Sequence, residues 1–278
     1  MSTIQESAAE TQAATVDAPP KKAMGLGRTA SWVMLIILLI LPLFVRNFVI
    51  FQVTMLLIYG IAVLALNILT GGSGQFSLGQ SAFYAIGAYT AAILIEHGNV
   101  NYVLTLPAAG IICFIVGFLF GLPALRLSGI YLALATFALA VAMPQLLKLG
   151  VIEHWTGGVQ GLVVTKPDAP FGLPMSQDMW LYYFTLVVSI AIYLASVNLL
   201  RSRSGRAMMA IRDNEIAAAA MGVDLSIYKT LAFGVSAGIT GVAGALGAIA
   251  VQFVAPDSYT FQLAIALFLG MVVGGVGW

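Results

Sequence analysis

The stretch TLAFGVSAGITGVAGALGAIAVQFV, residues 230–254, contains no charged side chain. A helix needs about 20 mainly apolar residues to cross the hydrocarbon core of a bilayer, and this run is long enough. Its five glycines recur every three or four residues: Gly234, Gly238, Gly241, Gly244 and Gly247. Because a face without side chains allows close approach of a neighbouring helix, the stretch predicts a tightly packed membrane span.

The composition of the whole chain indicates that lipid is its main solvent. Of its 278 residues, 60 % are hydrophobic and only 8 % are charged, against about 25 % charged in ordinary soluble domains. The net charge of +1 does not indicate a nucleic-acid partner. The single cysteine, Cys113, excludes an intramolecular disulfide and a cysteine-based metal cluster. These values exclude a soluble domain.

Apolar runs predict an all-α, polytopic membrane protein with about eight transmembrane helices. The predicted spans are approximately 30–45, 51–69, 76–95, 102–122, 129–150, 180–200, 230–254 and 261–278. The third span contains Ser77 and Gln80, and the fifth contains Pro144 and Lys148. Polar or broken segments at membrane depth face protein or a watery cavity, so we expect these two spans to line the interior.

The distribution of basic residues predicts a cytoplasmic N-terminus. Threading eight spans from that side places nine Lys and Arg residues inside and three outside, as the positive-inside rule requires. The outside residues are Arg46, Lys148 and Lys166. The polar segment 1–29 is then a disordered cytoplasmic tail, followed by a membrane domain over 30–278. Because the last span is apolar up to Trp278, we expect the chain to be truncated at its C-terminus.

Two long loops connect the spans, residues 151–179 outside and residues 201–229 in the cytoplasm. The cytoplasmic loop carries eight of the 23 charged side chains. Its alanines favour a helix, Gly222 suits the position after a helix end, and Asp224 can cap the next helix. We therefore expect a helix, a glycine turn and a second helix. The thin alanine helix suits insertion into a groove on another protein, although it could equally be a surface helix joining two spans.

Two further features have a functional and a structural interpretation. The glycines of residues 71–79 could expose backbone N–H groups to an anionic substrate, or form a flexible turn with close helix packing. The pairs Glu96-His97 and Glu153-His154 could form a metal site or proton relay, but both lie at span ends where solvated charge is expected. We therefore expect no metal. The glycine run does not match a P-loop, because no Lys-Ser or Lys-Thr follows it and no such motif occurs elsewhere in the sequence. We therefore expect no bound cofactor.

Four blocks of the sequence resemble a known family. Glu215, Ala217, Ala218 and Gly222 reproduce E-x-A-A-x-x-x-G and resemble the EAA loop of the permeases of ATP-binding-cassette (ABC) importers. Residues 69–89, LTGGSGQFSLGQSAFYAIGAY, resemble the signature of the branched-chain amino acid permeases of that class. Residues 129–136 and 156–162 resemble two further blocks, and all four occur in the family's order.

The resemblance implies a transport subunit that is not itself an enzyme. It implies import of branched-chain amino acids across the bacterial inner membrane, with ATP used by two cytoplasmic ATPase subunits. It also implies a homologous permease subunit and an extracytoplasmic substrate-binding protein, besides membrane lipid. The residues expected at the ATPase contact are Arg212, Glu215, Ala217, Ala218, Gly222 and Asp224. Those expected along the substrate path are Ser77, Gln80, Tyr89, Thr156 and Gln160.

Other functions remain open at this point. The same family includes permeases for urea and short amides, and the motifs do not separate these substrates. A secondary transporter driven by an ion gradient would need intramembrane carboxylates or basic residues, which are scarce in these spans. A non-transport membrane scaffold would leave the helix around Glu215–Gly222 without a partner.

Overall fold

The computed structural model describes residues 26–125, 127, 129–167 and 175–275. The chain divides into two compact units, Met1–Val45 and Arg46–Trp278. In the first unit, α2 (Leu26–Phe44) begins four residues before the predicted first span. Most of the predicted tail, residues 1–25, lies outside the described residues.

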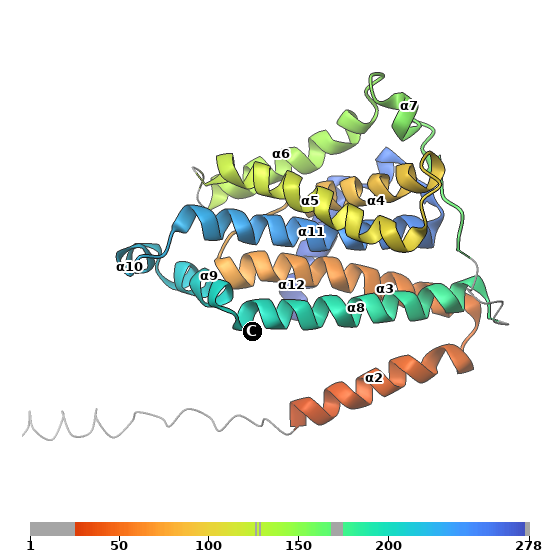
Figure 1. Ribbon diagram of the computed structural model, residues 1–278, viewed down its shortest axis with the longest axis horizontal. Coiled ribbons are helices and arrows are strands. Elements are labelled where there is room, and N and C mark those ends of the chain that lie inside the picture. The colour runs from red at the N-terminus through yellow and green to blue at the C-terminus, as the bar shows by residue number, and fades with distance from the viewer. Residues whose placement is uncertain (1–25, 126, 128, 168–174, 276–278) are drawn as a thin grey trace, which may run out of the picture. The chain divides into compact units, whose positions relative to one another are not determined.

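The second unit is built almost entirely from helices (Figure 1). Its long helices are α3 (Asn47–Asn67), α4 (Gln80–Glu96), α5 (Tyr102–Ala124), α6 (Ile130–Leu147), α8 (Gln177–Arg201), α11 (Leu225–Val251) and α12 (Phe261–Gly274). Its short elements are the π-helix η1 (Ile68–Gly72), α7 (Glu153–Thr156), α9 (Arg203–Asp213), α10 (Glu215–Ala220), the 3₁₀ turn η3 (Pro256–Ser258) and strands β1 (Leu162–Val163) and β2 (Phe253–Val254). The all-α prediction is confirmed.

The number of membrane spans differs from the prediction of about eight. Six segments are long and apolar enough to cross a membrane: Asn47–Gly72, Tyr102–Pro123, Ile130–Leu147, Gln177–Arg201, Leu225–Val251 and Pro256–Gly274. A shorter apolar segment, Val33–Phe44, belongs to α2. The described residues therefore give six spans, or seven with the short one.

The predicted span 76–95 accounts for part of the difference, because its helix starts late. Residues 74–79 are not helical, and α4 begins at Gln80. The Gln80 side chain donates to Ser236 and accepts from Thr240, both at 2.8 Å. These partners lie about 17–23 Å along the 27-residue α11, taking about 1.5 Å per residue. Helix α4 therefore begins near the middle of α11 (Figure 1).

The glycine face of α11 holds the bundle together, as the sequence predicted. Gly234, Gly238 and Gly241 lie against α5, where a Cβ atom on Gly241 would collide with Cys113. Gly244 and Gly247 lie against Tyr84 of α4. Helix α11 is also the most deeply buried of the six spans. Because these glycines lack side chains, the backbones of three helices come into direct contact.

The loops predicted inside and the loops predicted outside lie at opposite ends of the second unit. The loops predicted outside meet at one end, where β1 pairs antiparallel with β2 and Lys148 Nζ lies 2.6 Å from Asp257 Oδ1. The short helices α9 and α10 of the predicted cytoplasmic loop lie at the opposite end (Figure 1). The structure of the second unit is therefore consistent with the predicted alternation of inside and outside loops.

The close contact between α4 and α11 predicts a large difference between two Gly→Ala variants. A Cβ atom on Gly87 would overlap the carbonyl oxygen of Gly241, whereas one on Gly60 would meet nothing within 4 Å. Overpacking costs about 1–3 kcal/mol, so Gly87→Ala should lower the melting temperature in detergent by about 2–10 °C. Gly60→Ala should keep or raise it, because alanine favours helix. Equal melting temperatures would contradict this packing.

Candidate functional site

The cytoplasmic loop contains two short helices with a break that the sequence analysis missed. Asn214 lies in extended backbone between α9 and α10, and its Oδ1 accepts hydrogen bonds of 3.0 Å from the N–H groups of Ile216 and Ala217. The loop was predicted as one helix up to Gly222. Asparagine is a favoured N-cap and Glu215 suits the first helical turn, so Asn214-Glu215 was the available signal.

The C-terminal end of α10 has the predicted glycine turn. Gly222 has a φ of +83°, and its N–H donates to Ala219 O at 3.0 Å. The N–H of Val223 donates to Ala218 O at 3.0 Å, which completes a Schellman motif. Asp224 then caps α11 by accepting from Ser226 and Ile227. Both capping predictions are confirmed, and α10 is fixed at each end.

Helix α10 presents exposed apolar side chains at the end of the bundle that is predicted to be cytoplasmic. Ile216 is 84 % exposed and Met221 is 85 % exposed, whereas Ala218 is buried against the protein. The remaining alanines, including Ala217, are exposed and add little bulk. We call this surface the α10 face, comprising Ile216, Ala217, Ala219, Ala220 and Met221. A clustered apolar surface in water is typical of a protein contact.

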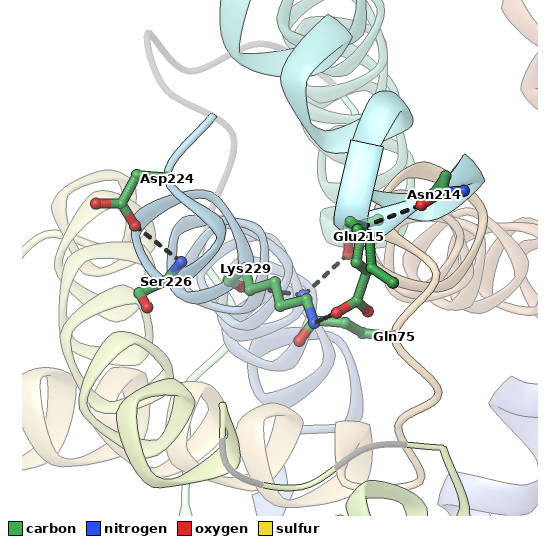
Figure 2. Close-up of polar contacts among 8 residues, drawn as sticks. Gln75, Asn214, Glu215, Asp224, Ser226 and Lys229 are labelled. Carbon is green, nitrogen blue, oxygen red and sulfur yellow. Dashed lines mark hydrogen bonds and ion pairs between the residues drawn. The ribbon is translucent and has the colours of Figure 1, made fainter. Parts of the chain in front are cut away.

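An ion pair attaches α10 to the start of α11. Glu215 Oε2 lies 2.7 Å from Lys229 Nζ (Figure 2). The carbonyl oxygen of the same lysine accepts a 3.1 Å hydrogen bond from Gln75 Nε2, which also donates to Ser73 Oγ. Figure 2 shows Lys229 between Glu215 and Gln75. The α10 face is therefore joined through α11 to the non-helical segment before α4.

Arg212 makes a second connection to the same region. Its Nη1 donates a 2.7 Å hydrogen bond to the carbonyl oxygen of Gly71 in η1, and its Nε and Nη2 donate to Asp213. Gly74 has a φ of +72°, and a Cβ atom there would lie 3.1 Å from Arg212 Cγ. Glycine therefore allows both the turn and the close approach. π-Helical turns are frequent at functional sites. The contact between Arg212 and η1 is therefore a candidate route by which movement of the loop would reach the segment before α4.

Several backbone N–H groups between η1 and α4 have partners within the chain. The N–H of Leu78 donates to Thr136 Oγ1 at 2.9 Å, and the N–H of Gly79 donates to Ser77 Oγ at 3.2 Å. Non-helical backbone is tolerated at membrane depth only where it has such partners or faces water. The sequence predicted that backbone N–H groups of residues 71–79 could bind an anionic substrate. Two of them, those of Leu78 and Gly79, are instead hydrogen-bonded to side chains of the protein.

Three of the predicted substrate-path residues lie within the bundle, in different surroundings. Ser77 lines an apolar groove of about 380 Å³ together with Ile130 of α6 and Phe268 of α12. The side-chain amide of Gln80 is paired with α11 through both its nitrogen and its oxygen. Tyr89 is buried, and within the described part of the chain its hydroxyl has no hydrogen-bond partner.

The other two predicted residues belong to the outer loop. Thr156 is buried and donates a 3.0 Å hydrogen bond to Leu147 O at the end of α6. Gln160 is exposed, just before Gly161, whose φ of +74° allows close approach to Val254. The five residues therefore do not form one cluster, because these two lie at the outer end and Ser77 lies before α4.

The two Glu-His pairs meet on the outer surface. The rings of His97 and His154 have centroids 6.1 Å apart, and His97 also contacts Trp155. All three side chains are exposed. Across the described ranges, no group of three or more His, Cys, Asp or Glu residues is placed to hold a metal ion.

Comparison with known proteins identifies the family. The family model described as "Branched-chain amino acid transport system / permease component" matches residues 48–278. The chain belongs to this permease family. It is a multi-pass protein of the inner membrane, and both the spans and the family support that location.

Three curated permeases are similar to the chain. The high-affinity branched-chain amino acid transport system permease protein LivM of Salmonella typhimurium is 35 % identical over 247 residues, which cover 81 % of this chain. The protein of the same name from Escherichia coli is 34 % identical with the same coverage. A probable LivM of Methanocaldococcus jannaschii is 26 % identical over 179 residues, or 63 % of this chain and 50 % of that protein. The chain spans 58 % of the length of the first two relatives. No solved structure matches it.

The Arg212 contact predicts a change in backbone protection far along the sequence. In Arg212→Ala, hydrogen exchange across residues 68–79 should accelerate by about tenfold or more. A hydrogen bond to a charged group contributes about 1.5–3 kcal/mol, and 1.4 kcal/mol is a factor of ten. The control is Arg206→Ala, because the Arg206 side chain donates to the nearby carbonyl oxygen of Arg201 and not to η1. Equal exchange in both variants would show that Arg212 does not hold η1.

Proposed function

We propose that this chain is the membrane subunit of an ABC importer that moves branched-chain amino acids into the cell. Family membership supports this function, because the model that matches residues 48–278 describes a permease component of such a system. The named relatives are permeases for the same substrates. In this function the chain catalyses no reaction and binds no cofactor, and ATP is hydrolysed by separate subunits.

The exposed α10 face is the observation that carries the proposal. Ile216 and Met221 present apolar surface at the cytoplasmic end, where an ATPase subunit would dock. Two cytoplasmic ATPase subunits would then serve this chain and a homologous permease subunit, one for each α10 face. On the other side of the membrane, an extracytoplasmic binding protein would deliver the amino acid to the loop that contains Thr156 and Gln160.

The contacts behind the α10 face suggest how ATP binding would move the permease. When the ATPase subunits close, α10 is displaced, and its two connections transmit that displacement. One runs from Arg212 to the carbonyl of Gly71. The other runs from Glu215 to Lys229 and from its carbonyl to Gln75. Both connections end in the region between α3 and α4, so the non-helical segment would move with the ATPase.

The proposed contact predicts that charge on the α10 face blocks assembly. Ile216→Asp and Met221→Asp should weaken ATPase binding on the order of thirtyfold, as loss of a central contact worth ~2 kcal/mol requires. The measurement is co-purification of the ATPase subunits with the permease. Val159→Asp is the matched control, because Val159 is an apolar residue 68 % exposed on the outer loop. If both α10 variants retain the ATPase as well as this control does, the α10 face is not its docking site.

Transport by the reconstituted complex tests the proposed function as a whole. Leucine uptake into proteoliposomes should require ATP and the loaded binding protein, and should survive collapse of the proton gradient. Uptake that continues without ATP but stops when the gradient collapses would identify an ion-coupled transporter. Competition by urea or acetamide, but not by leucine, would reassign the substrate to the short amides.

A further inference from the structure

Four tyrosines from separate parts of the chain meet in the outer half of the bundle. The ring of Tyr84 on α4 lies 6.3 Å from that of Tyr59 on α3 and 5.9 Å from that of Tyr259 after η3. Tyr89, five residues further along α4, contacts Tyr259 with ring centroids 6.2 Å apart. The space for this cluster depends on α11, because a Cβ atom on Gly247 would overlap the Tyr84 hydroxyl.

Three of these tyrosines border a cavity of about 80 Å³, which we call the tyrosine cavity. Tyr59, Tyr84 and Tyr259 line it together with apolar side chains that include Met55 and Leu263. Among the described residues that line it, none carries a charge. One water occupies about 30 Å³ of liquid, so the cavity has the volume of roughly two to three waters. That is the scale of a small aliphatic group and is less than a whole amino acid.

The cavity lies near the predicted outer end of the bundle. Gly247 is near the outer end of α11, and Phe253 of β2 and Ser258 of η3 also border the cavity. Tyr59 is 37 % exposed, so the lining reaches the surface of the second unit. A ligand arriving from the extracytoplasmic side would therefore meet this cavity before it reached the groove beside Ser77.

A buried polar atom on a residue that packs against the cavity lining is unexplained by the fold. The hydroxyl oxygen of Tyr89 is buried and has no hydrogen-bond partner among the described residues, and its ring packs on Tyr259, which lines the cavity. Buried polar groups are almost always hydrogen-bonded, so an unpaired one indicates a water or ligand that is bound in some states.

We propose that the tyrosine cavity receives the aliphatic side chain of the transported amino acid during entry and selects its size. This inference rests on the proposed function and assigns the cavity to it. Selection follows from the apolar lining and the limited volume, because the cavity accommodates a branched chain of three or four carbons and excludes an aromatic ring. The charged ammonium and carboxylate groups stay outside the cavity, since its lining offers no counter-charge.

Variants that change the cavity volume test the proposal through a ratio of substrates. Met55→Ala and Leu263→Ala enlarge the cavity, and each should raise the uptake of phenylalanine relative to leucine on the order of tenfold, the effect of about one methylene in an apolar pocket. Gly247→Ala displaces Tyr84 and narrows the cavity, so it should lower the uptake of leucine relative to valine. Each amino acid is supplied on saturated binding protein, so that selection before the membrane does not contribute.

The control is Leu56→Ala, because Leu56 follows Met55 on α3 but is 69 % exposed and lies outside the lining. It should leave both ratios unchanged. If the unmodified complex shows no ATP-dependent uptake, the proposed function fails and this inference fails with it. If that uptake is present but the cavity variants keep the ratios of the control, the inference fails alone. Lower expression of a variant reduces the uptake of both amino acids equally, so it does not change the ratio between them.

Discussion

A backbone that leaves helical geometry inside a membrane must find its hydrogen-bond partners within the protein. The region from η1 to the start of α4 makes three hydrogen bonds to distant parts of the sequence, and one of them satisfies a backbone N–H of the non-helical segment. Arg212 donates to the carbonyl of Gly71, Thr136 accepts from Leu78, and Gln75 reaches the carbonyl of Lys229. Two of these three partners belong to the cytoplasmic loop or the adjoining start of α11. The non-helical segment before α4 and the loop that carries α9 and α10 are therefore parts of one hydrogen-bonded unit.

Helix α11 extends this unit toward the outer side of the membrane. Its first turns contain Lys229, which pairs with Glu215, and its last turns contain Gly247, which makes room for Tyr84. The two positions are about 27 Å apart along the helix axis, at about 1.5 Å per residue. Between them, Ser236 and Thr240 hold the side chain of Gln80. One well-packed helix thus connects the α10 face with the tyrosine cavity, which suits a protein that couples events on opposite sides of a membrane.

The sequence predicted the features that depend on local chemistry. The glycine face of α11, the turn at Gly222 and the cap at Asp224 each follow from residue type and spacing, and each is confirmed. The break at Asn214 was also readable, because asparagine before glutamate favours a helix start. The late start of α4 could not be predicted, because hydropathy measures apolar content and does not report where a backbone leaves the helix.

Contacts between distant residues could not be derived from one sequence. Arg212 and Gly71 are 141 positions apart, and nothing in either neighbourhood specifies the pairing. The same applies to the tyrosine cluster, whose members come from α3, α4 and the segment after η3. The motifs predicted a substrate path that included Gln80, but motif matching cannot distinguish a side chain that binds a solute from one that joins two helices. Here both ends of the Gln80 amide are joined to α11.

The central claim is that the loop that carries α9 and α10 moves as one body with the segment before α4. Spin labels at Ala210, an exposed residue of α9 that lies outside the α10 face, and at the exposed Phe76 would report the distance between them in the assembled transporter by double electron–electron resonance. The account predicts a narrow distance distribution with the same mean in the nucleotide-free and ATP-bound states. A mean that shifts on ATP binding, with the loop moving while the segment stays in place, would contradict it.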